Sequence, residues 1–140
     1  MGGSVAYLNP EGAAPPQGLY SNVARVEAGT LLFIAGQLSV GMDRAVVGKG
    51  DFAAQFRQVF LNLGAVLRGL DLRFDDIAKF TTYLVHSQHI EDFMVARVAL
   101  FPQLFSTPHY PPNTLLIVDR LVKEEFLIEV EAIARERKPR

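Results

Sequence analysis

Apolar residues return at helical spacing in the segment that follows Asp51. They mark one face of a helix whose other face is polar. The Asp51 carboxylate can accept hydrogen bonds from the free amides of a first turn, so we expect it to cap this helix. Gly69, followed by Leu70, predicts the end of the helix, with the glycine in the left-handed conformation. The apolar positions are Phe52, Phe56, Val59, Leu63, Val66 and Leu67.

A second amphipathic segment begins near Ser87, which we expect to cap another helix. Arg97 interrupts its apolar face. Pro102 should kink this helix or end it early, because proline removes a backbone donor and crowds the preceding turn. The apolar positions are Ile90, Phe93, Phe101 and Leu104.

Short runs rich in β-branched and aromatic residues predict strands. The first two enclose the turn at 28–30 and are expected to pair as a hairpin. Residues 41–50 are rich in glycine and are interpreted as a loop, with a short strand at 45–47 as an option. The predicted strands are 23–27, 31–36, 77–85, 114–118 and 126–134.

These elements predict a single α+β domain over residues 18–135, between an irregular N-terminal arm (1–17) and a charged tail (136–140). The order β-β-α-β-α-β-β gives one sheet with two helices on one face. The last strand carries large apolar groups on both of its faces. Because the helices cover only one face, we expect the other face to lie in a subunit interface.

Composition narrows the function classes. The chain has 140 residues, of which 49% are hydrophobic and 21% charged, as in a globular domain. Its net charge of -1 gives no strong field for nucleic acid or an anionic membrane. The lack of cysteine excludes disulfides, thiolate nucleophiles and cysteine-ligated zinc. No apolar run approaches the roughly 20 residues of a membrane span, and the first residues do not resemble a secretion signal, so we expect a cytoplasmic protein.

Five motifs occur in an order that points to one family. They are LFIAGQ at 32–37, DI at 76–77, EDF at 91–93, PNT at 112–114 and IEVEAIA at 128–134. With them the sequence resembles the reactive intermediate deaminase family, also called RidA or YjgF, which includes L-PSP endoribonuclease-like proteins. The resemblance covers roughly residues 18–135, and the closing IEVEAIA is its most specific part.

This resemblance implies a chorismate-mutase-like α+β fold assembled as a homotrimer, in which the sheets of three subunits form a central barrel. It implies small-molecule clefts between subunits. The activity it implies is hydrolysis of imines and enamines to 2-keto acids and ammonia, without a metal or an organic cofactor.

Three departures from the family pattern bear on this activity. Deaminating members carry a P-x-R-[ST] motif whose arginine binds the substrate carboxylate, whereas this chain has the uncharged Asn113 at that position. The usual S-G-Q is here Ala35-Gly36-Gln37, which removes a hydroxyl from the cleft wall. The turn before the last strand reads Leu121-Val122-Lys123, with one extra residue. The specificity implied is therefore altered.

The resemblance assigns site residues position by position. Glu129 matches the glutamate that orients or activates the attacking water. Tyr20, Gly36, Asn113 and Leu115 match positions that line the cleft. Arg97 stands where the family often has asparagine, and we hypothesise that it supplies the missing positive charge.

Several alternatives stay open. A non-catalytic metabolite sensor would keep the cleft without turnover, and an RNA-cleaving or translation-inhibiting protein is a third possibility. The basic tail has few charges and lies beside no aromatic stripe, which argues against nucleic acid. Glu131 is expected to form structural ion pairs rather than share catalysis with Glu129. His86, His89 and His109 are expected at the surface rather than around a metal ion.

Overall fold

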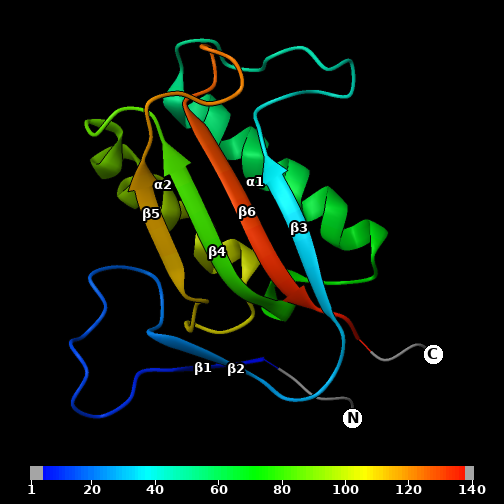
Figure 1. Cartoon of the computed structure of the whole chain (residues 1–140), viewed down its shortest axis with the longest axis vertical. Coiled ribbons are helices and arrows are strands. Elements are labelled where there is room, and N and C mark those ends of the chain that lie inside the picture. The colour runs from blue at the N-terminus through cyan, green and yellow to red at the C-terminus, as the bar shows by residue number, and fades with distance from the viewer. Residues whose placement is uncertain (1–4, 138–140) are drawn as a thin grey trace.

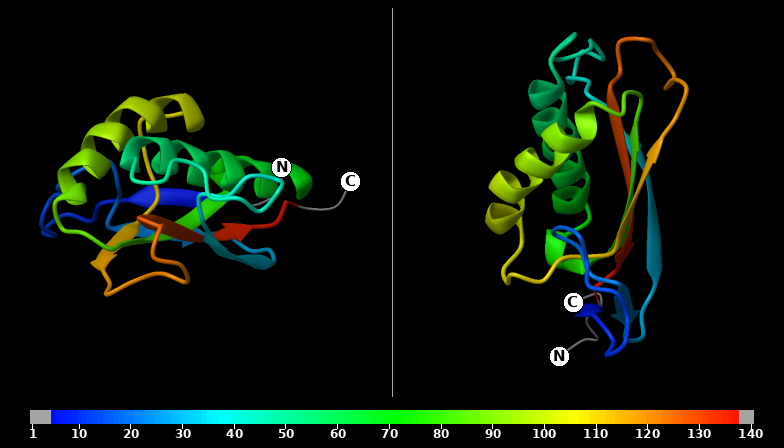
Figure 2. Two further views of the ribbon diagram at one scale, coloured as in Figure 1. Left: turned by 90° about the horizontal axis from the view of Figure 1, so that it is seen from above. Right: turned by 90° about the vertical axis from the view of Figure 1, so that its left-hand side faces the viewer.

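The computed structural model describes residues 5–137. Its main body is a four-stranded sheet with both helices on one face, which confirms the predicted α+β class (Figures 1 and 2). The strands are β1 (Val5–Leu8), β2 (Val23–Val26), β3 (Leu31–Gln37), β4 (Ile77–Leu84), β5 (Asn113–Ile117) and β6 (Ile128–Arg135). The helices are α1 (Phe52–Gly69), the short 3-10 turn η1 (Phe74–Asp76) and α2 (His89–Leu104). In the main sheet the order is β3-β6-β4-β5, with β4 and β5 parallel and the other neighbours antiparallel.

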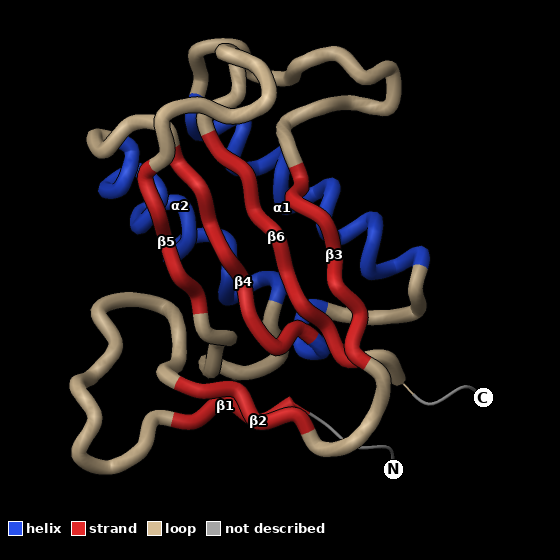
Figure 3. The backbone as a smooth tube through the Cα atoms, viewed as in Figure 1, coloured by secondary structure: helices blue, strands red, loops and turns tan. Residues whose placement is uncertain are grey.

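The predicted hairpin of the first two strands is wrong. β2 pairs with β1, which lies in the segment expected to be an irregular arm, and together they form a separate two-stranded sheet below the main one (Figure 3). Ala28 and Gly29 have positive φ angles and turn the chain between the two sheets. The guanidinium of Arg135 on β6 donates Nε–H to the Ala28 carbonyl at 2.5 Å, so this turn is bound to the end of the main sheet. The connection therefore delivers β3 to β6 rather than back to β2.

The small sheet is anchored to the main one through Tyr7. Its hydroxyl donates a hydrogen bond to the carbonyl of Ile77, at the start of β4, at 2.7 Å. Burial raises the pKa of Tyr7 above the ordinary tyrosine value, and the nearby carboxylates of Asp75 and Asp76 raise it further. The phenol is therefore neutral over the whole ordinary pH range.

The ends of α1 agree only in part with the sequence prediction. Asp51 caps the helix as expected, because its Oδ1 accepts from the Ala54 amide at 3.0 Å. At the other end the left-handed residue is Asp71, with φ of 59°, and not Gly69. The Leu72 amide donates to the Leu67 carbonyl at 2.8 Å and closes the helix end.

The start of α2 also differs from the prediction. Its N-cap residue is Gln88, which makes no side-chain capping bond, so Ser87 does not cap the helix. Pro102 lies inside the helix, which ends two residues later at Leu104. The optional strand at 45–47 is reduced to a single bridge between Val40 and Val46.

Phenylalanine side chains from both helices and β4 fill the space between helices and sheet. The ring of Phe60 on α1 contacts Phe80 on β4 edge-on, with centroids 5.9 Å apart, and Phe101 on α2 at 5.5 Å. On β6, Ile128 and Val130 point into this core and are fully buried. The alternation of the strand therefore turns its glutamates to the opposite face, which no helix of the described chain covers (Figure 2).

Candidate functional site

Glu129 lies on β6 and points to the uncovered face of the sheet. Its side chain packs directly against the backbone of Gly36 on β3, where the pairing of β3 with β6 shifts register between Ile34 and Gln37. A Cβ at position 36 would overlap the Glu129 Oε2 and lie 2.6 Å from its Cδ. Glycine at position 36 therefore makes the space that the carboxylate occupies.

The environment of Glu129 changes its acidity. Partial burial raises the pKa of its carboxyl above the ordinary value, and the negative charge of Glu131 on the same strand raises it further. A carboxyl with a raised pKa holds a proton at higher pH than an ordinary glutamate, which suits a group that takes up and returns a proton.

Glu131 has a partner of its own on β4. The Tyr83 hydroxyl donates a hydrogen bond to Glu131 Oε1 at 2.5 Å. This bond, followed by burial and the charges of both glutamates, raises the pKa of Tyr83. Sequence reasoning predicted a structural role for Glu131 but did not identify Tyr83 as its partner, because the register of β4 against β6 decides which side chains meet.

Asn113 and Leu115 lie on β5, at the other edge of the sheet. In the parallel pairing they stand opposite Phe80 and Thr82, so their side chains point to the helix-covered side. Asn113 Oδ1 accepts a hydrogen bond from the Thr82 hydroxyl at 2.8 Å, and Thr82 is buried. Asn113 is thus engaged within its own chain, although its amide NH₂ group has no hydrogen-bond partner among the described side chains.

Arg97 is the largest of the fully buried side chains in the described part of the molecule, with 2% of its surface exposed. It projects from α2 toward the loop that leads into β2. Its Cζ lies 5.9 Å from the ring centre of Tyr20 and 5.0 Å from that of Phe93. Nη2 donates to the Met94 sulfur at 3.0 Å. Burial lowers the pKa of Arg97 to about 10, which leaves the guanidinium charged at neutral pH.

The predicted site residues therefore form two groups. Glu129 and Gly36 come together on the uncovered face, whereas Arg97 and Tyr20 meet on the helix-covered side, where Asn113 also points. Within one chain the sheet lies between the two groups, so one copy does not bring them together, and the cleft between subunits stays a prediction.

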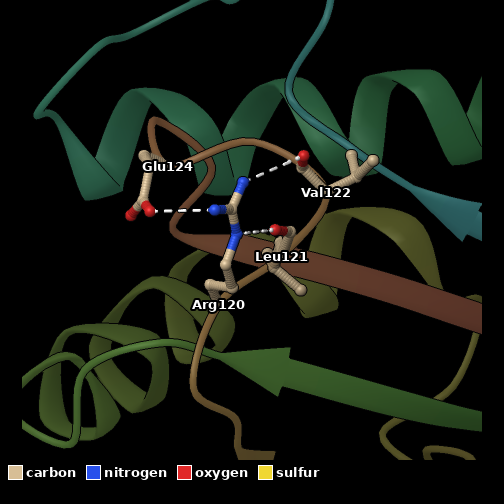
Figure 4. A network of polar contacts seen from close by, with 4 residues as sticks. All are labelled: Arg120, Leu121, Val122 and Glu124. Atoms are coloured by element: carbon tan, nitrogen blue, oxygen red, sulfur yellow. Dashed lines mark hydrogen bonds and ion pairs between the residues drawn. The ribbon is translucent and has the colours of Figure 1, made fainter.

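The loop that precedes β6 carries a polar network of its own (Figure 4). Arg120 donates to the carbonyls of Leu121 and Val122, at 3.0 and 3.3 Å, and pairs with Glu124 at 3.0 Å. These contacts close the loop in which the sequence has an extra residue before the last strand. They fix the chain where it enters the strand of Glu129.

Between residues 5 and 137, no group of three histidine, aspartate or glutamate side chains is placed to hold a metal ion. His89 stacks on Phe52 with ring centres 4.6 Å apart, and burial lowers its pKa. In the same part of the chain, no helix is long and apolar enough to cross a membrane.

Similarity to known proteins agrees with this geometry. A family model described as Endoribonuclease L-PSP matches residues 11–136. A RutC family protein of Pyrococcus horikoshii is 36% identical over 124 residues, which covers 89% of this chain and 92% of the relative. The 2-iminobutanoate/2-iminopropanoate deaminase of Escherichia coli strain K12 is 32% identical over 122 residues, covering 85% and 90%.

A solved structure extends the likeness to three dimensions. The Rid family protein YyfB of Yersinia pestis, titled as a protein of unknown function, superposes with a TM-score of 0.84 at 30% identity, covering 94% of this chain and 98% of that one. Fold and site together define a small α+β protein with a carboxylate on its open sheet face. The chain belongs to the RidA/YjgF family, also known as the L-PSP family.

Proposed function

We propose that this protein is a hydrolase of carbon–nitrogen double bonds, of the enamine/imine deaminase type, with a specificity altered by Asn113. The observation that carries the proposal is the Glu129 carboxylate, seated against Gly36 on the uncovered face with a raised pKa. Relatives named 2-iminobutanoate/2-iminopropanoate deaminase support the reaction class. We place its action in the cytoplasm, as expected from the sequence.

In this reaction Glu129 orients a water molecule and takes its proton while the water oxygen bonds to the imine carbon. Glu129 passes this proton to the imine nitrogen, and the product of this step is a carbinolamine. Glu129 then takes the proton of the carbinolamine hydroxyl and delivers it to the amino nitrogen as the carbon–nitrogen bond breaks, which releases ammonia and leaves a keto group. Glu129 is unchanged at the end of the cycle, and no cofactor enters the balance.

A homotrimer is part of the proposal. Phe33 on β3 is 75% exposed on the uncovered face, and Leu31 and Ile133 lie on the same face. An apolar patch of this kind favours burial against another copy. Because Glu129 and Arg97 lie on opposite sides of one sheet, a cleft that uses both takes them from two different copies.

A non-catalytic metabolite sensor is the second candidate. It is favoured by one observation: the Asn113 amide oxygen already accepts from Thr82, and the side chain carries no charge for a substrate carboxylate. In such a protein the cleft would bind its ligand without releasing a product. RNA cleavage, the activity that the family model's description names, has no basic stripe to support it in a chain with a net charge of -1.

The test is release of 2-keto acids from imines generated in situ. The wild-type protein is compared with Glu129→Gln and Asn113→Arg, and with Arg57→Met, which removes an exposed charge on α1, as the control. The proposal predicts turnover in the wild type, loss of at least about 100-fold in Glu129→Gln, and no change in the control. Turnover that survives Glu129→Gln contradicts it. Binding without turnover in every variant supports the sensor.

The trimer has a separate test. Phe33→Glu places a charge on the uncovered apolar face, where its desolvation opposes association. Light scattering after gel filtration is expected to give the mass of three chains for the wild type and of one for the variant. A wild-type monomer contradicts the proposed assembly.

A further inference from the structure

The guanidinium of Arg97 is buried, and no carboxylate of the described residues lies beside it. Among residues 5–137 it forms no ion pair, and its Nε is fully buried without a hydrogen-bond partner. The polar contact that it does make is with the weakly accepting thioether of Met94. Two other arginines, Arg120 and Arg137, each pair with a carboxylate, and the buried Arg135 donates its Nε–H to the Ala28 carbonyl.

The contacts of Arg97 compensate only part of the cost of burying its charge. A buried charge is normally paired, because its transfer from water costs several kcal/mol even after relaxation. The rings of Tyr20 and Phe93 offset part of that cost through cation–π attraction, which is stronger where water is excluded. The N–H groups of the guanidinium still need acceptors, and a carboxylate supplies two acceptor oxygens in the matching planar geometry.

The residues around the Arg97 guanidinium favour a small carboxylate over a phosphate. Gly18, in the loop before β2, lies against the guanidinium. A Cβ at this position would overlap Nη2 of Arg97 and would lie 3.6 Å from the Met94 sulfur. The other neighbours are the aromatic side chains of Tyr20 and Phe93. A phosphate would need several more donors than this single cation, whereas a small carboxylate with an apolar body matches one guanidinium among apolar walls.

We infer that Arg97 binds the carboxylate of the ligand and that the ligand is a small organic monocarboxylate. The position thus takes over, from α2, the charge that Asn113 does not provide from β5. The choice of a keto or imino acid as the ligand rests on the proposed function. The inference itself concerns binding and is measured without turnover.

The experiment is calorimetric titration with 2-oxobutanoate and with 2-oxobutanamide, which has a similar shape and no charge. The variant is Arg97→Met, and Arg57→Met is the matched control, since it removes an exposed arginine from α1. We expect the wild type and the control to bind the acid at least about 10-fold more tightly than the amide. Arg97→Met should bind the acid roughly 10- to 100-fold more weakly, with the amide unchanged.

Stability without ligand distinguishes binding from a structural role. Because Arg97 has no ion pair among residues 5–137 to lose, and methionine removes the buried charge, Arg97→Met should melt at the same temperature as the wild type or higher. A lower melting temperature or a dissociated assembly would show that Arg97 stabilises the fold or the assembly, and would overturn the inference. Equal or absent binding of the two compounds by the wild type would also overturn it.

The variants Arg97→Lys and Gly18→Ala keep the inference testable if Arg97→Met does not fold. Lysine keeps the charge without the planar pair of donors, so preference for the acid should be reduced and not lost. Alanine at position 18 displaces the guanidinium tip and should weaken acid binding while the amide is unaffected. Undiminished acid binding in both variants contradicts the assignment. Loss of imine hydrolysis with acid binding intact contradicts only the proposed function.

Discussion

The substitution Gly36→Ala is expected to displace the side chain of Glu129 while its carboxyl group is retained. The new methyl carbon would overlap Oε2 and lie 2.6 Å from Cδ and 2.8 Å from Cγ of Glu129. Either the glutamate rotates or strands β3 and β6 separate. Rotation into a less favourable rotamer costs about 0.5–1.5 kcal/mol, which is less than breaking ladder hydrogen bonds, so we expect the side chain to move.

The two consequences of this substitution differ in size. Gly36 is not among the glycines with positive φ, so alanine is accepted by the backbone and stabilises through the unfolded chain by about 0.4–1 kcal/mol. This gain offsets the rotamer cost, and the free energy of unfolding should change by less than about 1 kcal/mol. Displacing a catalytic carboxylate by about 1 Å can reduce turnover by about 100-fold. A large loss of activity in a stable protein is the expected pattern.

The assay measures 2-keto acid release and urea unfolding on the same preparations. Gly69→Ala is the control, because a Cβ there meets nothing within 4 Å and its backbone φ is also not positive. Titration of Glu129 followed by carbon-13 NMR gives an independent reading, since burial raises its pKa and a displaced carboxylate should titrate nearer to the ordinary value. Full activity together with an unchanged Glu129 pKa would refute this account of Gly36.

Three further substitutions test other parts of the molecule by urea unfolding. Burial raises the pKa of Glu129 above 4.5, so folding favours its protonated form. The stability that this gives is complete below pH 4.5 and is lost as the pH rises through the folded-state pKa. Glu129→Gln should therefore be at least as stable as the wild type at pH 7, and the difference should disappear in acid; a variant less stable than the wild type at pH 7 would be inconsistent with this. Tyr7→Phe should lower the free energy of unfolding by about 1–2 kcal/mol at pH 7, because the Ile77 carbonyl loses its donor. The raised pKa of Tyr7 gives stability that is complete below pH 10 and is lost as the pH rises further, so the variant should lose less stability in alkali than the wild type. An equal loss of stability in both proteins would contradict the anchoring role of Tyr7. Gln55→Leu should cost about 2–4 kcal/mol, since the fully buried amide holds the Leu127 N–H and two loop carbonyls; a cost below about 1 kcal/mol would show that these groups find other partners.

Local structure could be predicted from the sequence where residues close in the chain determine it. The cap at Asp51 depends on an amide three residues away, and the apolar face of α1 depends on a repeat within the helix. The α+β class follows from the order of such elements. The end of α1 at Gly69 is confirmed, but the prediction that Gly69 takes the left-handed conformation is wrong, because Asp71 tolerates that conformation and adopts it instead.

Pairing between distant strands could not be predicted in the same way. Val5–Leu8 is too short to show a period, and only its contact with β2 makes it a strand. The first hairpin was expected because the two strands are close in sequence. In the folded chain Arg135, more than a hundred residues away, holds the turn at Ala28 and sends β3 to a different sheet.

The same distinction between local and distant contacts applies to the candidate site. The alternation of β6 alone determined that Glu129 and Glu131 share the face opposite to Ile128 and Val130, because side chains of a strand alternate whatever its neighbours are. Only the tertiary structure decided that Gly36 makes room for Glu129, since this depends on how two strands nearly a hundred residues apart are aligned. It also decided that Arg97 lies buried against Tyr20 with no ion pair among residues 5–137, because burial and charge balance are properties of the packed chain and not of a residue or its neighbours in sequence.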